Sequence, residues 1–567
     1  MTHLSTDVLI VGAGGAGMYA AIAAARNGSS VLLLDKSLVG RGGATIMAQM
    51  TVAAAISHQE PDHWTLHLAD TKEAGRDICD GVLSEILCED APKRIHEMDQ
   101  WGAHWAREEG HIKQVVAPGH SRSRCCYVDF LNTGPAVAGT LRRQISKMET
   151  IKRLSNVAVT DVLVHDGQAV GAAGLDVIEG EVVTFEAKAV ILAAGGLTKL
   201  YSRNSASTNM AGEAYALALW AGAELIDMEF VQFFPIAHLA PRLVGMDPIM
   251  WDPFRYKLGG RLLNGNFEEF IHLYGGSDAG KYTAVRDLAS YAILKEVEAG
   301  RGSPHGGVYL DFSHLPEAEL RGAFGPVIDR LLANGIDLTK MPIEVGPTAH
   351  YQMGGVRVNG RMETSVNGLY AAGEAVGGAN GANRLSGNAI SEALVFGERA
   401  GRFAAEQARH VTSAWNARLA SPAVDQVRTL QEHKGKSGVH PVTLQSELKD
   451  LMWENAGPFR TADKLTMSLA RINEIQRHDF TDLAISRERQ FNLDLQDWFE
   501  LRAMLTTAEA VVTAALARTE SRGAHQRLDF PDSDASFVKN QVLQLKNGRL
   551  TVGWTPVVQS QVKVVEI

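Results

Sequence analysis

One stretch near the N-terminus, Asp7 to Asp35 (DVLIVGAGGAGMYAAIAAARNGSSVLLLD), constrains the fold of this chain more than any other. Val8 to Val11 form a short apolar run before a glycine, which is typical of a buried strand. An alanine-rich run then predicts a helix, and Val31 to Leu34 predict a second strand. The turn between strand and helix has the GxGxxG spacing, with its glycines at Gly12, Gly14 and Gly17.

This strand–turn–helix–strand unit suits a dinucleotide. The first two glycines allow a tight turn and a close backbone approach to a pyrophosphate, and the third lets the helix pack on the strand. The helix N-terminus favours the phosphate charge, and Asp35 lies where a carboxylate can accept a hydrogen bond from a ribose hydroxyl. A glycine turn that only packs is the alternative. The stretch alone leaves open whether the ligand is NAD or FAD.

The bulk composition excludes several classes of protein. At 567 residues the chain is too long for one hydrophobic core and should form several domains. A net charge of −10 argues against nucleic acid or an anionic membrane surface as a partner. No uninterrupted apolar run reaches the ~18 residues of a membrane span, and the first apolar run belongs to the glycine unit. We therefore expect neither a direct membrane span nor a signal peptide.

The cysteines indicate a reducing environment. The chain has four, none of them in a CxxC pair: Cys79, Cys88, Cys125 and Cys126. Four thiols in so long a chain do not form a disulfide scaffold, so we expect buried free thiols and a cytoplasmic location. We expect no zinc or iron–sulfur centre within this chain.

A second cofactor signal lies far along the chain, at Gly368 to Glu398 (GLYAAGEAVGGANGANRLSGNAISEALVFGE). A strand ends at Gly373-Glu374, and a glycine-rich bend then opens a helix near Asn388. The carboxylate can accept from a ribose hydroxyl, and the helix start can face a carbonyl or phosphate oxygen. One dinucleotide contacted from both ends of the chain favours a flavin over a nicotinamide.

Motifs along nearly the whole chain resemble one family, the succinate dehydrogenase and fumarate reductase flavoproteins, with L-aspartate oxidase as a relative. The motifs beside GxGxxG are FVQF at 230–233, RDLAS at 286–290, TAHYQMGGV at 348–356, GANRLSGN at 381–388 and ESRGAHQRLDFP at 520–531. They follow the order of the family.

The resemblance implies an α/β FAD-binding Rossmann-like domain with an inserted α+β capping domain, a C-terminal helical domain and a small C-terminal β region. The expected boundaries are 1–235 and 356–415 for the FAD-binding domain, 236–355 for the capping domain, 416–530 for the helical domain and 531–567 for the β region. The pattern of apolar and turn residues agrees with these boundaries. Helical patterns cover 444–455, 461–478 and 496–519, and Asn547-Gly548 predicts a hairpin turn.

The resemblance assigns roles to individual residues. Arg286 corresponds to the arginine that delivers or removes the proton at the carbon–carbon bond, and this normally permanent cation needs a relay to do so. Asp252 and Arg255 match that relay by their three-residue spacing. His350 and Arg384 match residues that bind a substrate carboxylate. Singly, each could be structural, but their joint occurrence in family motifs favours function.

The same resemblance and the two glycine-rich signals predict the cofactor-binding residues. They are Gly12, Gly14, Gly15, Gly17, Asp35, Lys36, Gly43, Ala44, Thr45, Gln49, Ala194, Gly195, Glu374, Arg384, Asn388, Ala389 and Ile390.

Departures from the family pattern are informative. Succinate dehydrogenases carry a histidine bonded covalently to the flavin, but Ala44 occupies that position, so we expect non-covalent FAD. Phe234 replaces the histidine that holds the second carboxylate of a dicarboxylate, and Trp251 replaces its threonine partner. Leaving that carboxylate desolvated would cost several kcal/mol. We therefore expect a substrate with one carboxylate and one apolar end, unless His238 compensates and restores a fumarate-like substrate.

The resulting hypothesis is a flavoprotein, or flavoprotein subunit, that exchanges a hydride between FAD and the C–C bond of a small carboxylate: fumarate or succinate, or a related enoate. An iron–sulfur electron-transfer subunit is an expected partner and would place the chain at the periphery of a membrane. Two alternatives are an oxidase similar to L-aspartate oxidase and a non-redox flavin-binding scaffold. The joint presence of Arg286, His350 and Arg384 argues against the scaffold.

Overall fold

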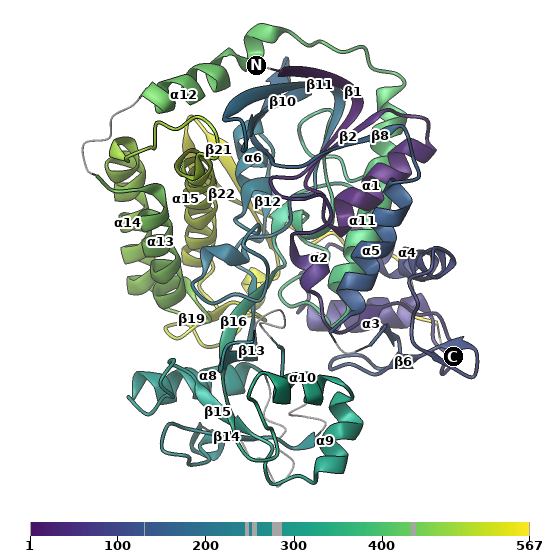
Figure 1. Ribbon diagram of the computed structural model, residues 1–567, viewed down its shortest axis with the longest axis vertical. Coiled ribbons are helices and arrows are strands. Elements are labelled where there is room, and N and C mark those ends of the chain that lie inside the picture. Colours follow the sequence, from purple (N-terminus) through teal and green to yellow (C-terminus); the bar gives the residue numbers. More distant parts are fainter. Residues whose placement is uncertain are drawn as a thin grey trace.

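The computed structural model describes residues 2–129, 131–243, 249–251, 258–274, 286–432 and 438–565. In this part of the chain the largest sheet has seven strands in the order β8-β2-β1-β11-β10-β9, with β18 paired to β11 (Figure 1). The strands are β1 (Thr2–Val11), β2 (Val31–Leu34), β8 (Ile151–Leu154), β9 (Val157–His165), β10 (Gln168–Asp176), β11 (Glu181–Leu192) and β18 (Leu369–Ala371).

The first glycine-rich stretch forms the centre of this sheet. β1 pairs in parallel with β2 and with β11, and the last three residues of β11 also pair in parallel with β18. The earlier part of β11 pairs antiparallel with β10, and β10 with β9. Val8 to Val11 are at most 6% exposed. This burial explains a continuous apolar run in place of alternation, because parallel strands are covered on both faces.

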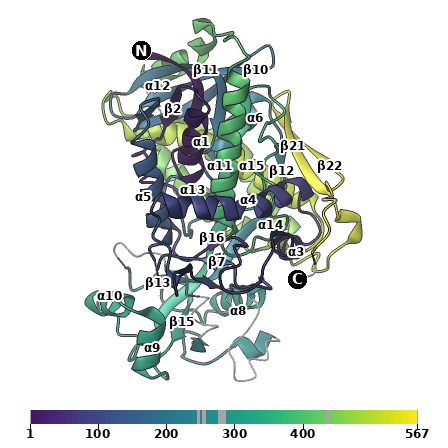
Figure 2. The same ribbon diagram turned by 90° about the vertical axis from the view of Figure 1, so that its right-hand side faces the viewer.

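Two helices that are far apart in the sequence pack together beside the sheet. They are α1 (Gly15–Arg26) and α11 (Asn388–Ala408), which lie side by side in Figure 2. A Cβ at Gly401 would lie 2.1 Å from the carbonyl oxygen of Ala20. Glycine therefore lets α11 approach α1 closely and join both glycine-rich signals in one unit.

A second hydrophobic core lies between Ile236 and Val345, within the segment expected to form the capping domain. Two long antiparallel strands, β13 (Val231–Ala240) and β16 (Ile343–Gln352), connect it to the main sheet's unit. Figure 1 shows this part at the lower end of the molecule. Its other elements are β14 (Arg261–Leu263), β15 (Val308–Asp311), α8 (Arg286–Glu298), α9 (Glu317–Phe324) and α10 (Val327–Ala333).

The helical segment agrees with the sequence pattern to within a few residues. Its described helices are α12 (Ser421–Glu432), α13 (Pro441–Ala456), α14 (Ala462–Arg477) and α15 (Leu493–Ala517). The longest, α15, is buried along much of its length, which fits its predominantly apolar sequence.

The predicted hairpin forms near the C-terminus, from β21 (Asn540–Lys546) and β22 (Arg549–Thr555). Asn547 and Gly548 both have positive φ, at 52° and 71°, as a two-residue hairpin turn requires. The hairpin also pairs with β12 (Leu225–Ile226), which the sequence did not predict. The C-terminal region is thereby attached to the strand segment that precedes β13.

The remaining described elements surround these units. They are α2 (Ala44–Met47), α3 (Trp64–Ala74), α4 (Gly81–Gln100), α5 (Thr133–Ile145), α6 (Glu213–Ala221), β3 (Val52–Ala53), β4 (Arg107–Glu108), β5 (His111–Ile112), β6 (Gln114–Val115), β7 (Cys125–Cys126), β17 (Gly355–Val356), β19 (Phe459–Arg460) and β20 (Gln526–Arg527).

The cysteine prediction is confirmed: all four thiols are free and buried. Burial raises the pKa of the Cys79, Cys88 and Cys125 thiols to about 12. Among the described residues, no group of three or more His, Cys, Asp or Glu side chains is arranged to bind a metal ion. No helix in the described ranges is long and apolar enough to cross a membrane.

Candidate active site

A long cavity opens where β1, β2 and β11 end. Its walls include Val11 to Ala16, Leu34 to Lys36 and Ala193 to Gly195. Ligands of open α/β sheets bind beyond the carboxyl ends of the strands. The cavity thus lies where the first glycine-rich stretch predicted a dinucleotide.

The glycines of the turn have distinct physical roles. Gly12 has φ 101°, and a Cβ there would lie 2.4 Å from the carbonyl oxygen of Ala193. A Cβ at Gly17 would lie 1.9 Å from the carbonyl oxygen of Gly12, so Gly17 serves helix–strand packing and does not line the cavity. Around Gly14 the nearest side-chain atom to a Cβ is 4.0 Å away. This leaves space for a phosphate at the start of α1, so the turn fits the pyrophosphate of FAD.

Asp35 lines the cavity and also orders the turn. Its Oδ2 accepts a hydrogen bond from the Ala13 amide at 3.0 Å, and its Oδ1 accepts from the amide and hydroxyl of Ser37, both at 2.8 Å. A carboxylate oxygen can accept more than one hydrogen bond. The predicted contact to a ribose hydroxyl remains a proposal.

The second glycine-rich segment supplies the other side of the cavity. Glu374 lines it and accepts from the Gln352 amide at 3.1 Å, and burial raises the pKa of its carboxyl to about 7. Ala389 and Ile390 line the cavity at the start of α11. Most predicted cofactor-binding residues share this cavity: Gly12, Gly14, Gly15, Asp35, Lys36, Gly43, Ala44, Thr45, Gln49, Ala194, Gly195, Glu374, Arg384, Ala389 and Ile390.

Asn388 departs from this prediction. It is fully buried, and its side chain does not line the cavity in the part of the chain that is described. Its Oδ1 is 2.8 Å from Nε2 of His67, and its amide donates to the Thr71 hydroxyl at 3.2 Å. The amide therefore fixes the start of α11 against α3, and the backbone of the next residues faces the cavity.

The predicted carboxylate-binding pair does come together. His350 and Arg384 line the same cavity as the glycine turn. Arg384 is 7% exposed, and its Nη2 donates to Oε1 of Gln232 at 3.0 Å. Its guanidinium lies 4.4 Å from the ring centroid of Tyr351. Nδ1 of His350 is 2.7 Å from the Ser205 hydroxyl. Gln232 and Tyr351, which orient Arg384, lie in two of the family motifs, whereas Ser205, beside His350, lies outside all of them.

An apolar group adjoins this pair. Phe234 and Met250 line the cavity, and the Phe234 ring lies 5.3 Å from the His350 ring, tilted by 60°. Together with Ala237 they form a small buried cluster. The cavity wall beside His350 is therefore apolar at Phe234 and Met250, as the replacement of a family histidine by Phe234 predicts.

Trp251 and His238 are placed differently from the prediction, which had both contact the substrate. Trp251 is fully buried in the second core, and its indole Nε1 donates to Nδ1 of His238 at 3.1 Å. Nε2 of His238 hydrogen bonds the carbonyl oxygen of Pro241. Neither is among the described residues that line the cavity. A buried indole N–H needs a partner, and His238 provides it.

The predicted proton-transfer residues are at the limit of the described chain. Arg286 is the first residue of α8, and its side chain lies outside the described part of the structure. Asp252 and Arg255 lie outside the described residues altogether. Their roles remain predictions.

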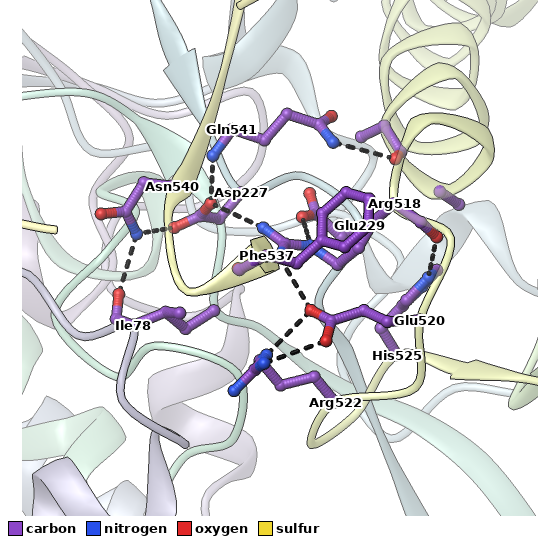
Figure 3. Close-up of polar contacts among 12 residues, drawn as sticks. Ile78, Asp227, Glu229, Arg518, Glu520, Arg522, His525, Phe537, Asn540 and Gln541 are labelled. Carbon is purple, nitrogen blue, oxygen red and sulfur yellow. Dashed lines mark hydrogen bonds and ion pairs between the residues drawn. The ribbon is translucent and has the colours of Figure 1, made fainter. Parts of the chain in front are cut away.

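A buried ionic network supports the strand that carries Gln232. Figure 3 shows Arg518, at the end of α15, among the carboxylates of Asp227, Glu229 and Glu520. These four side chains are fully buried. Arg518 also lies 5.0 Å from the ring centroid of Phe230, next to β13. The C-terminal segment is thereby joined to the strand that orients Arg384.

Comparisons with known proteins decide the family. The model of the FAD binding domain family matches residues 7–390, and that of the fumarate reductase flavoprotein C-terminal family matches residues 445–566. The chain belongs to the succinate dehydrogenase and fumarate reductase flavoproteins. It is an FAD-dependent oxidoreductase of the class that acts on CH–CH bonds, as the motifs implied.

Individual members of this flavoprotein family match nearly end to end. One subunit of the fumarate reductase (CoM/CoB) of Methanothermobacter marburgensis is 35% identical over 542 residues, 95% of this chain and 97% of that protein. The fumarate reductase flavoprotein subunit of Escherichia coli is 32% identical over 559 residues, 95% and 92% of the two chains. The structure of Mycobacterium smegmatis Sdh1 in complex with UQ1 superposes with a TM-score of 0.90 at 33% identity, covering 99% and 96%. The predicted fold class is confirmed.

Proposed function

We propose that this flavoprotein exchanges a hydride with the C–C bond of a small carboxylate: fumarate or succinate, or a related enoate with one apolar end. The observation that carries the proposal is the shared cavity: the glycine turn, His350 and Arg384 all line it, and the apolar Phe234 lies beside His350. Bound FAD supplies the hydride chemistry.

The protein's own residues position the substrate and move the proton. His350 and Arg384 hold one carboxylate, and the planar guanidinium allows bidentate contact. Arg286 handles the proton at the second carbon, with Asp252 and Arg255 as its relay. The capping segment excludes water from the site.

The apolar wall is the basis of the substrate preference. A second carboxylate placed against Phe234 and Met250 would be desolvated without a partner, at a cost of several kcal/mol. His238, the one residue expected to compensate, hydrogen bonds Trp251 and the Pro241 carbonyl oxygen. This placement of His238 supports an enoate with a single carboxylate as the substrate.

A substrate panel tests this preference. With a reduced dye as electron donor, we expect monocarboxylic enoates to have kcat/KM values about tenfold or more above that of fumarate, because one unpaired buried carboxylate costs at least about 1.4 kcal/mol. Phe234→His is the matched variant and should reverse the order. If fumarate reacts faster than every monocarboxylic enoate with the wild-type protein, the apolar-end proposal is wrong, while the general activity stands.

We also propose that FAD is held non-covalently. Ala44 is the first residue of α2 and lines the cavity, and a methyl side chain cannot bond to the flavin. Precipitation of the purified protein with acid should therefore release nearly all of the yellow flavin into the supernatant. Yellow colour retained in the washed, unfolded pellet would contradict this proposal.

An iron–sulfur subunit is the proposed electron-transfer partner. Several relatives bear names that describe them as subunits, including the fumarate reductase flavoprotein subunit of Escherichia coli. The family model that matches residues 445–566 is likewise described as the C-terminal part of fumarate reductase flavoproteins.

A further inference from the structure

One face of α15 forms part of the cavity wall, although this helix belongs to the helical segment and not to the glycine-rich unit. The residues of this face are Gln496, Phe499, Glu500 and Ala503. Their spacing of i, i+3, i+4 and i+7 is that of neighbours along one side of a helix. These four side chains therefore form a continuous stripe along one side of α15 in the cavity wall.

Glu500 is the charged residue of this stripe, and it joins two lysines from distant parts of the chain. Its Oε2 is 2.7 Å from Nζ of Lys36, which directly follows Asp35, and its Oε1 pairs with Nζ of Lys199. Lys36 also pairs with Glu213. Two cations and two anions thus form a compact, nearly buried group.

The electrostatics keep Lys36 and Glu500 charged. Burial opposes the charge of Lys36, but Glu213 and Glu500 more than offset it, so the pKa of the ammonium is raised. Burial likewise opposes the charge of Glu500, but Lys36 and Lys199 lower the pKa of its carboxyl overall. At neutral pH Lys36 and Glu500 therefore form an ion pair in this nearly buried group.

Close packing fixes α15 at this position. The hydroxyl of Thr507 donates to the carbonyl oxygen of Gly212 at 3.0 Å. Gly212 has φ 87°, and a Cβ there would lie 2.8 Å from the Thr507 side chain. The Arg502 guanidinium lies 4.0 Å from the ring centroid of Trp220 on α6. The contact between α15 and α6 is therefore specific.

The stripe of four residues on α15 lies at that end of the cavity where β2 ends. The Val157 amide donates to the carbonyl oxygen of Asp35 at 2.9 Å, so β9 starts beside the end of β2, and Val157 to Thr160 line the cavity. Trp220 lines it as well. In this fold the end of the second strand receives the adenosine ribose of the dinucleotide. α15 therefore faces the adenosine half and not the flavin ring.

An unsatisfied atom indicates that a ligand completes this end. Oε2 of Glu213 is buried and has no hydrogen-bond partner among the described residues. Glu213 lines the cavity and is held by Lys36. A buried carboxylate oxygen normally accepts a hydrogen bond, and a ribose hydroxyl is a donor of the right kind.

We propose that α15 forms a wall of the adenosine half of the FAD site and that Glu500 is its positioning residue. Glu500 holds Lys36 and Glu213 at the ribose end and ties them to the helical segment. FAD binding and docking of α15 are therefore coupled. The inference depends on FAD binding in this cavity and not on the proposed substrate.

The test uses the full-length apo-protein, prepared by chaotrope extraction or by expression in a riboflavin auxotroph. FAD, ADP and FMN are titrated separately, since ADP represents the adenosine half and FMN the flavin half. Glu500→Gln should raise the dissociation constants of FAD and ADP about tenfold or more, because Lys199 loses its carboxylate partner and Lys36, left with Glu213 alone, is no longer held to α15 by an ion pair. The dissociation constant of FMN should stay within about twofold of the wild-type value.

The matched control is Glu509→Gln, which changes a carboxylate on the same helix that pairs with Gln476 outside the cavity. It should leave the binding of all three ligands unchanged. Gln496→Ala is a milder second variant if Glu500→Gln fails to fold, and it should weaken FAD and ADP binding about threefold while sparing FMN.

Hydrogen exchange gives a readout that needs no variant. Addition of FAD or ADP should slow amide exchange in 495–503 of α15 and leave α14 unchanged. Two results would overturn the proposal. One is a Glu500→Gln protein that is less stable but binds FAD and ADP with wild-type affinity. The other is an equal loss of ADP and FMN affinity, which would show a general structural effect.

Discussion

Replacing Arg384 with lysine is expected to lower kcat/KM for the carboxylate substrate by about 10²- to 10⁴-fold. Arginine offers a planar fork to a carboxylate, whereas lysine offers a single ammonium. The fork is pre-oriented here, because Nη2 donates to Gln232 and Nη1 donates to the carbonyl oxygen of Leu385 at 2.9 Å. A lysine has no planar fork to make both contacts from separate nitrogens, and it would lose the flat stacking of the guanidinium on Tyr351.

Steady-state rates per bound flavin measure this effect, since normalisation separates lost substrate binding from lost cofactor. Arg402→Lys is a suitable control, because Arg402 also stacks on an aromatic ring, at 4.2 Å from the Phe403 centroid, and does not line the cavity in the described chain. It should retain wild-type kinetics. A kcat/KM of Arg384→Lys within about threefold of wild type would remove Arg384 from the carboxylate site.

The parts of the site that the sequence predicts correctly depend on local patterns. The turn after β1 requires glycine because a Cβ at Gly12 or Gly17 would meet backbone atoms. Such a steric requirement leaves a fixed spacing in the sequence. The hairpin turn at Asn547-Gly548 is local in the same way, since its φ values restrict which residues fit.

The parts that the sequence did not predict depend on contacts between distant residues. Lys36 and Glu500 are separated by 464 positions, and no local pattern connects them. Only the structure shows that Glu500 is an acidic residue on the buried face of a largely buried helix. Trp251 was expected to contact the substrate because it replaces a binding residue of the family. The Trp251 indole instead lies in the second core. Burying so large an apolar ring is more favourable than placing it at the substrate, where the family residue lies.

The Arg518 network yields the largest expected effect on stability. Arg518→Met should lower the free energy of unfolding by about 3–5 kcal/mol, because it leaves the buried carboxylates of Asp227 and Glu229 without their cation, while Glu520 keeps Arg522. The guanidinium contacts Glu229 and Glu520, and it donates to the carbonyl oxygens of Phe537 at 2.9 Å and Lys539 at 3.1 Å. One side chain thus satisfies groups on two segments of the chain (Figure 3).

Urea titration of the FAD-saturated protein measures the loss. Arg428→Met is the matched control, since Arg428 forms an exposed ion pair with Asp425, and it should change the free energy of unfolding by less than about 1 kcal/mol. Restoring charge balance provides a second check. Adding Glu229→Gln to Arg518→Met removes an uncompensated buried anion and should recover part of the lost stability.

The neighbouring carboxyl of Asp227 limits how much of the lost stability Glu229→Gln can recover. Burial, and then the charge of Glu229, raise the pKa of Asp227 to about 7, while Arg518 lowers it. Without Arg518 the pKa of Asp227 rises further, so its carboxyl takes up a proton at neutral pH and removes part of the excess charge by itself. The hydrogen bonds to Phe537 and Lys539 remain lost. If Arg518→Met lies within about 1 kcal/mol of wild type, the network does not hold the C-terminal segment against β13.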